Sequence, residues 1–337
     1  MSVQLPAFSK MPKPARARVE PESAMHRRVP VGPVVVLLVA LALLGVGRLT
    51  TPAFVTGTNM LTILRAASLT AIVALGLTFV TISGNFFSLS VAQTAVVGSV
   101  LYAALADRGG FALGLAGVLA VCLVLGAMQG AVVGRGGNPI VVTLAAGAAI
   151  VGVVLIATHN DRVLLTTPPG SLAVRFGQAS PLGVPTQTWA FGVVAIACYL
   201  ILSRTVLGRR TILLGANRRA AVATGMNAVR VIMFAFAISS VTAGIAGALT
   251  SAQFGVADSQ QFNGMDIDAI AAVLVGGTSI RGGEGSVLRT CIGAVFIAML
   301  RNLLQIRGYT TGVQLTVEGI TVVVAVCAYA FIKRKDH

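Results

Sequence analysis

The fold of this chain is decided by a short apolar run that passes into a glycine-rich stretch, Asp268-Ala-Ile-Ala-Ala-Val-Leu-Val-Gly-Gly-Thr-Ser-Ile-Arg-Gly-Gly-Glu-Gly-Ser286. The run at 268–278 is shorter than the roughly 20 apolar helical residues that cross a bilayer. Five glycines in the ten positions from 276 to 285 cannot sustain a stable helix. Irregular backbone at membrane depth is tolerated where protein covers it or where it lines a water-filled cavity. The stretch therefore predicts a half-helix rather than a full crossing, followed by a gate at Gly276, Gly277, Thr278, Gly282 and Gly283.

The composition of the 337-residue chain indicates a membrane protein. Apolar residues (AVILMFWYC) make up 56% and charged residues only 10%, whereas soluble proteins average about 25% charged residues. So few charges cannot cover a water-facing surface, and the same numbers exclude disorder, collagen, coiled coil and a secreted disulfide scaffold. The net charge of +15 could suggest nucleic-acid binding. The basic residues, however, lie in short clusters between long apolar runs, which is typical of membrane topology.

The apolar runs predict about ten membrane segments. The uncharged run at 29–47 is long enough to span and lacks a signal-peptide cleavage site, so we interpret it as a retained first helix. Further runs lie at 66–83, 88–106, 111–133, 139–158, 188–203, 231–254, 268–278, 286–304 and 313–332. We expect an all-α integral membrane domain over 29–332, between a basic tail at 1–28 and a short tail at 333–337.

The distribution of Lys and Arg predicts the orientation. With a cytoplasmic N-terminus and ten crossings, 18 of the 25 basic residues lie inside, as the positive-inside rule requires. Both termini are then cytoplasmic. Two connections are longer than a tight turn needs: residues 159–187, expected outside, and residues 204–230, expected inside. Long loops in compact proteins usually contact something.

The inner loop contains a predicted short helix that follows Asn217 and stops at Gly225. These residues are a typical N-cap and a typical C-terminal stop. Arg218 and Arg219 would lie in the first turn, where the helix dipole disfavours cations. They therefore either serve a partner or simply retain the loop inside. The helix would present three small side chains on which another backbone could dock: Ala220, Ala221 and Ala223.

Polar side chains interrupt the apolar pattern around the start of the third segment. They are Asn85, Ser88, Ser90 and Gln93. Because intramembrane polar groups must find partners, they either face a solute path or hydrogen-bond to neighbouring helices. Near the opposite end of the chain, Arg301 and Glu318 lie within about two turns of the outer ends of their helices, and we expect them to pair.

The sequence carries no motif for catalysis, metal or cofactor binding. It contains no G-x-x-x-x-G-K-[ST], and all four lysines lie in the tails, so no P-loop binds nucleotide. A Ser/His/Asp set, paired membrane carboxylates and H-E-x-x-H are also absent, so we do not expect an enzyme. The cysteines lie inside apolar runs without C-x-x-C spacing and are interpreted as small buried hydrophobic residues: Cys122, Cys198, Cys291 and Cys327.

Together these stretches resemble the permease subunits of bacterial ABC importers for sugars, of the ribose-transporter type, which are related to branched-chain amino-acid permeases. The resemblance runs from about residue 50 to 332. Asp268–Val287 is its most specific part, and Pro139-Ile-Val-Val-Thr143-Leu and Leu214–Gly225 also fit. The family's docking helix reads E-A-A-x-x-x-G, and here Arg219 stands where glutamate is usual. In the family's G-G-I-D-L-S-V motif, Ser88 replaces the aspartate.

The resemblance implies one permease subunit of an alternating-access importer in the bacterial inner membrane. Thr143 and the polar and glycine-rich residues would form the pathway and gate, and the inner loop would dock the ATPase. The implied partners are a second permease subunit, identical or not, two cytoplasmic ATPases that use ATP and Mg²⁺, and a periplasmic or lipid-tethered binding protein. Helices 2–5 and 7–10 would be related by inversion.

The cargo implied by the resemblance is a ribose-type monosaccharide, but other cargoes stay open. The same machinery could import nucleosides, amino acids or another small polar solute, because a few side chains decide specificity. An ion-driven secondary carrier is the more distant alternative. Such a carrier would need intramembrane carboxylates, which we do not find in the sequence.

Overall fold

The computed structural model of this chain describes residues 41, 44–45, 47–49, 51–168 and 170–335. The predicted tail at 1–28 and most of the first segment at 29–47 lie outside these residues; residues 41, 44–45 and 47–49 are helical. The described elements are η1 (Pro52–Val55), α2 (Gly57–Ile82), α3 (Val91–Gly134), α4 (Pro139–Thr158), β1 (Val163–Leu164), α5 (Leu172–Gln178), η2 (Pro181–Gly183), α6 (Thr186–Arg204), α7 (Val206–Ala216), α8 (Arg218–Ala223), α9 (Ala228–Phe254), β2 (Val256–Ala257), α10 (Met265–Val275), α11 (Val287–Ile306) and α12 (Thr311–Lys335).

Six described helices are long and apolar enough to cross a membrane: α2, α3, α4, α6, α9 and α11. The element α3 combines the predicted runs at 88–106 and 111–133, but its backbone is not helical at Gly109 and Gly110. Gly110 has a φ of 74°, which glycine adopts without strain. Two helices are thus joined at this kink. The total of ten segments stays a prediction.

The helix α10 has the length that a half-helix requires. It contains 11 residues and therefore spans about 16 Å, roughly half of a bilayer core of about 30 Å. It ends at Val275, and its C-cap Gly276 begins the glycine-rich stretch.

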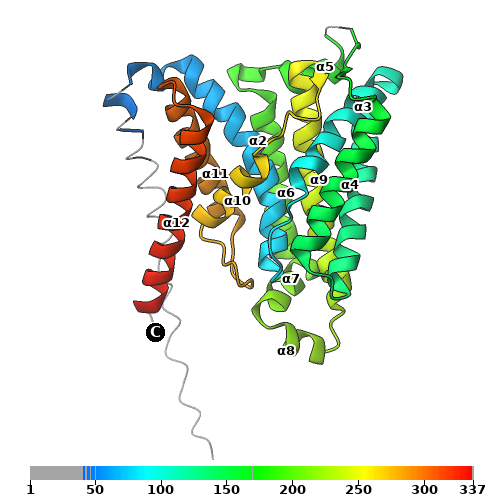
Figure 1. Ribbon diagram of the computed structural model, residues 1–337, viewed down its shortest axis with the longest axis vertical. Coiled ribbons are helices and arrows are strands. Elements are labelled where there is room, and N and C mark those ends of the chain that lie inside the picture. The colour runs from blue at the N-terminus through cyan, green and yellow to red at the C-terminus, as the bar shows by residue number, and fades with distance from the viewer. Residues whose placement is uncertain (1–40, 42–43, 46, 50, 169, 336–337) are drawn as a thin grey trace, which may run out of the picture. The chain divides into compact units, whose positions relative to one another are not determined.

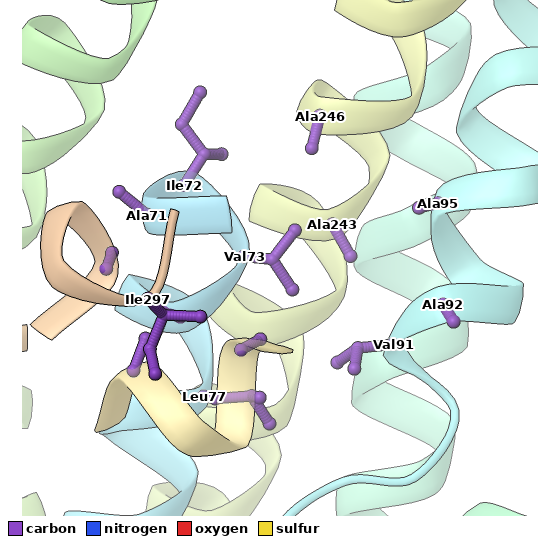
Figure 2. Packing of buried hydrophobic residues seen from close by; sticks show 14 of the residues in the cluster. Ala71, Ile72, Val73, Leu77, Val91, Ala92, Ala95, Ala243, Ala246 and Ile297 are labelled. Carbon is purple, nitrogen blue, oxygen red and sulfur yellow. The ribbon is translucent and has the colours of Figure 1, made fainter. Parts of the chain in front are cut away.

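Small residues allow the central helices to pack closely. In Figure 1, α2 and α9 lie in the middle of the bundle, with α3 and α4 on one side and α10, α11 and α12 on the other. Figure 2 shows the core between them, to which α2, α3, α9 and α11 contribute alanine, valine, isoleucine and leucine side chains. Gly98 of α3 packs directly on the backbone of Gly244 in α9. Such close approach is how helices associate in a membrane, where apolar burial alone gives little preference.

The two long connections are ordered rather than irregular. Residues 159–187 contain β1, α5 and η2, and Val163 of β1 pairs antiparallel with Ala257 of β2. The predicted all-α chain therefore includes two strands of two residues each. Residues 204–230 are mostly helical, because α7 and α8 fill them. Both connections are folded onto the bundle.

Asp107, at the turn between the two halves of α3, fastens the connection at 159–187. Its carboxylate accepts hydrogen bonds from the backbone N–H and hydroxyl groups of Thr166 and Thr167, over 2.6–3.0 Å. Burial raises the pKa of Asp107, but these four bonds outweigh it and hold the pKa below its ordinary value. The depressed pKa means that the bonds are present at neutral pH and are lost only as the pH falls through the folded-state pKa.

We expect Asp107→Ala to loosen this connection. Removal of the acceptor frees the amides of Thr166 and Thr167, so hydrogen exchange measured by mass spectrometry should quicken there about tenfold. Asp161→Ala removes an exposed carboxylate from the same connection and serves as the control. Equal exchange in both variants would show that Asp107 does not fasten the loop.

Candidate functional site

A tight loop follows α10, and we call residues 276–286 the gate loop. The Gly282 amide donates to the Ser279 carbonyl at 3.1 Å, and the Ser279 amide donates to the Glu284 carbonyl at 3.0 Å. Gly277 and Gly282 have φ values of 75° and 86°, a region that side chains disfavour. The hydroxyl of Thr278 is buried and has no hydrogen-bond partner among the described residues. The gate loop thus turns sharply, with Gly276 and Thr278 buried and Ile280, Arg281 and Glu284 exposed.

The gate loop meets two other segments at backbone distance. A Cβ on Gly282 would overlap the backbone of Gly84, which follows α2, and would lie 3.2 Å from the Cα of Gly215 in α7. The Gly283 amide also donates to the Ile82 carbonyl at 2.9 Å. We call Gly84, Gly215 and Gly282 the glycine junction. It brings the predicted gate into direct contact with the inner connection at 204–230.

The short helix α8 has the predicted ends. The side chain of Asn217 caps it by accepting from the Ala220 amide at 3.0 Å, and Gly225 has a φ of 80°. Arg218 and Arg219 are both exposed. The structure therefore presents two cations in the first turn, as the sequence indicated.

The expectation that three alanines of α8 face a partner is wrong for Ala221. Only 7% of Ala221 is exposed, and it lies in a core cluster with Val80, Leu214 and Phe236. Its side chain packs inward on the protein's own core. Ala220, Ala223 and half of the Val222 side chain remain exposed. The free surface of α8 thus comprises these residues and the arginines.

A layer of uncharged polar side chains lies where the first turn of α3 meets α4 and the second half of α3. Ser88 and Ser90 share a hydrogen bond of 3.1 Å, and Ser90 also donates to the Gln129 Oε1 at 2.8 Å. The Leu89 amide donates to the Thr143 hydroxyl at 3.2 Å. We call this set the polar layer: Ser88, Ser90, Gln93, Gln129 and Thr143. The structure therefore brings together three of the four polar candidates and Thr143.

The polar layer differs from the sequence prediction at two residues, Asn85 and Gln129. The side chain of Asn85 donates to the Ser83 hydroxyl at 2.9 Å and so lies beside the glycine junction. Gln129 was missed because it lies within the apolar run 111–133. A lone amide in a membrane run is itself a signal, since such groups must be satisfied.

A charged cluster joins α10, α11 and α12 at the end of α10 remote from the gate loop. The guanidinium of Arg301 contacts Asp268 and lies 3.8 Å from a Glu318 oxygen. Glu318 and Asp268 are buried, with side-chain exposures of 1% and 8%. The predicted pairing of Arg301 with Glu318 is confirmed, and Asp268 is a partner that the sequence analysis missed. We call these three residues the charged cluster.

No group of three or more His, Cys, Asp or Glu residues in the described part of the chain could hold a metal ion. The cysteines partly follow expectation. Cys122 and Cys198 are buried, Cys291 is intermediate and Cys327 is exposed. The interpretation of Cys327 as buried is wrong because it lies on a face of α12 that no other part of the described chain covers.

Comparisons with known proteins identify a family and several relatives. Residues 59–326 match the model of the family described as branched-chain amino acid transport system / permease component. The ribose import permease protein RbsC of Escherichia coli strain K12 is 31% identical over 293 residues, which cover 86% of this chain and 91% of that protein. The D-allose transport system permease protein AlsC of the same strain is 30% identical, covering 83% of this chain and 86% of that protein. The L-arabinose ABC transporter permease protein AraH of Azospirillum brasilense is 27% identical, covering 93% of this chain and 90% of that protein. No solved structure matches.

Proposed function

The chain belongs to the family of branched-chain amino acid transport system permease components, and from this premise we propose that it is the membrane-spanning permease subunit of a bacterial ABC importer for a ribose-type sugar. The relatives named above are permeases for ribose, D-allose and L-arabinose, which supports a monosaccharide cargo. The chain forms the solute pathway and is not itself an enzyme. A separate subunit hydrolyses ATP.

The contact between α7 and the gate loop at the glycine junction supports a mechanism for coupling ATP hydrolysis to transport. The exposed part of α8 docks on the ATPase, and α7, which contains Gly215, directly precedes α8 in the chain. Since Gly215 lies against Gly282 and Gly84 without any side chain between them, a displacement of α7 moves the gate loop. ATP-driven motion of the partner thereby reaches the solute pathway. The motion needs no flexible side chain to transmit it.

The assembly contains more subunits than this chain. A second permease subunit completes the pathway, two cytoplasmic ATPases bind ATP with Mg²⁺ on the inner side, and a periplasmic or lipid-tethered binding protein delivers the solute. We place the chain in the inner membrane with both termini in the cytoplasm. Ten segments cross or enter the bilayer, and helices 2–5 (α2, both halves of α3, and α4) are inverted relative to helices 7–10 (α9 to α12). Labelling of single cysteines from either side of the membrane tests this topology.

Co-purification tests the assembly directly. The tagged chain is extracted from its host in a mild detergent, and every protein that accompanies it is identified by mass spectrometry. We expect a soluble subunit with a P-loop, in an amount comparable to that of the permease. A chain that is purified without such a subunit, yet transports solute, would contradict the proposal and favour a secondary carrier.

The exposed surface of α8 gives a second prediction. Ala220→Trp places a bulky side chain on the docking surface without disturbing the core, because Ala220 is exposed. We expect sugar uptake by the assembled transporter to fall at least about tenfold, while stability changes by less than about 0.5 kcal/mol. Uptake of radiolabelled D-ribose and thermal unfolding measure the two effects.

Val323→Trp is the matched control for this prediction. Val323 is 61% exposed on α12, in a helix remote in sequence from the inner connection. The same bulky side chain there should leave uptake unchanged. If Ala220→Trp also left uptake unchanged, α8 would not be the docking helix.

A further inference from the structure

The polar layer contains hydrogen-bonding groups that have no partner in the described part of the chain. Gln129 is 5% exposed, and its Oε1 is engaged by Ser90. Its Nε2 has no hydrogen-bond partner in the described chain. Turning the amide over would only exchange which atom is left unpaired, since Ser90 can bond either one. A buried amide in this state is costly unless a further group binds it.

Gln93, one helical turn after Ser90, also has a buried side-chain amide atom without a hydrogen-bond partner in the described chain. Its Oε1 is buried and unpaired among the described residues, and it lies 3.4 Å from the position that a Cβ on Gly147 would occupy. Gly147 is one turn beyond Thr143 on α4, so Gln93 lies beside the same face of α4 as the Leu89–Thr143 contact. The absence of a side chain at Gly147 leaves the Gln93 amide next to bare helix.

The groups of the polar layer are all uncharged. Their hydrogen-bond partners in the described chain are hydroxyl, amide and backbone groups. A zwitterionic amino acid taken out of water needs partners that compensate both its ammonium and its carboxylate charge, and the layer contains no charged side chain. A sugar needs only donors and acceptors for its hydroxyl groups, and amides provide both. The chemistry of the layer thus selects a neutral polyhydroxylated solute.

Entry of a solute into the polar layer requires α4 to move. In this conformation Ser88, Ser90 and Thr143 are buried, so the layer is closed. The buried residues of α4 lie along one face only, and the helix packs mainly against α3. A helix held on one face can separate from its neighbour without opening the core between α2 and α9.

We propose that the polar layer is a binding subsite for the hydroxyl groups of an uncharged sugar, with Gln129 and Gln93 as the amides that contact it. This inference rests on the proposed function and adds the class of cargo and the residues that select it. It favours a sugar over an amino acid as the cargo. Gln129, which touches the solute, is a specificity-determining residue.

The test compares uptake by the complete transporter, expressed with its own partner subunits, of D-ribose, D-allose, L-arabinose and L-leucine. For the sugar that the wild type imports, Gln129→Leu should raise the apparent KM about tenfold, the loss expected for one hydrogen bond to a solute hydroxyl. The yield and melting temperature of the complex should stay close to those of the wild type. Ser90→Ala is a smaller change that should also raise the apparent KM. If the Gln129→Leu transporter does not assemble, the KM of Ser90→Ala tests the subsite instead.

Gln187→Leu is the control. Gln187 of α6 is also a buried glutamine with an unpaired Oε1, but its Nε2 donates to the Gly177 carbonyl in the connection at 159–187. Its replacement should change stability and leave KM unchanged. An unchanged KM in both Gln129→Leu and Ser90→Ala would overturn the subsite. In that case, ATP-dependent sugar uptake by the wild type would still support the proposed function. Wild-type uptake of L-leucine and of none of the sugars would overturn both.

Discussion

Gly282→Ala is expected to abolish solute uptake by an otherwise assembled transporter. A Cβ at this position would overlap the backbone of Gly84 and press on Gly215. Neither neighbour can rotate away, because each contact is with main chain. The positive φ of 86° adds about 1–2 kcal/mol for a residue with a side chain, and overpacking adds about 1–3 kcal/mol. The junction would be forced apart, and α7 and the gate loop would no longer move together.

Gly308→Ala separates these two effects. Gly308 has a φ of 73°, but nothing lies within 4 Å of the position that its Cβ would take. This variant therefore suffers the backbone strain without the overlap, and we expect it to transport. Uptake should be measured per assembled complex, with ATP hydrolysis in parallel. Equal activity of the two alanine variants would show that the glycine junction does not couple the gate to the inner connection.

Arg301→Met is expected to cause the largest loss of stability of any single change. It would leave the buried carboxylates of Asp268 and Glu318 unpaired, and loss of one partner from a buried ion pair costs about 3–5 kcal/mol. We expect the melting temperature of the purified protein to fall by roughly 10 °C. Glu318→Gln should cost much less, because the 3.8 Å contact is loose and the neutral amide needs no counter-charge.

The triple variant Asp268→Asn, Arg301→Met and Glu318→Gln is the informative control. With all three charges removed, most of the stability lost in Arg301→Met should return, because no uncompensated charge remains. If the triple variant is as unstable as Arg301→Met, packing rather than charge accounts for the role of Arg301. If Arg301→Met is as stable as Glu318→Gln, the charged cluster contributes nothing measurable.

Local features of the fold could be predicted because they depend on residues that are adjacent in the sequence. The half-helix and the gate loop follow from the glycine density after Val275, and the cap of α8 follows from Asn217. The break in α3 lies at Gly109 and Gly110, where two predicted runs were already separated. In each case the physical cause, a missing side chain or a capping group, lies within a few residues of its effect.

Contacts between distant segments could not be predicted in this way. Gly84, Gly215 and Gly282 come from three elements, and no spacing rule relates them. The pairing of Asp268 with Arg301 depends on how α10 lies against α11, which neither segment specifies alone. The inward orientation of Ala221 could not be predicted, because a helix of six residues contains too few turns for the sequence pattern to define its buried face. The glycine-rich stretch therefore predicted a gate without predicting what the gate touches.

This chain is proposed to form the pathway of an ATP-driven importer. The most direct test uses the purified permease reconstituted in vesicles with its ATPase and binding protein, and measures the entry of D-ribose. We expect entry that requires ATP, Mg²⁺ and the ATPase subunit and that does not depend on proton or sodium gradients. Entry through this chain alone, driven by an ion gradient without ATP, would contradict it.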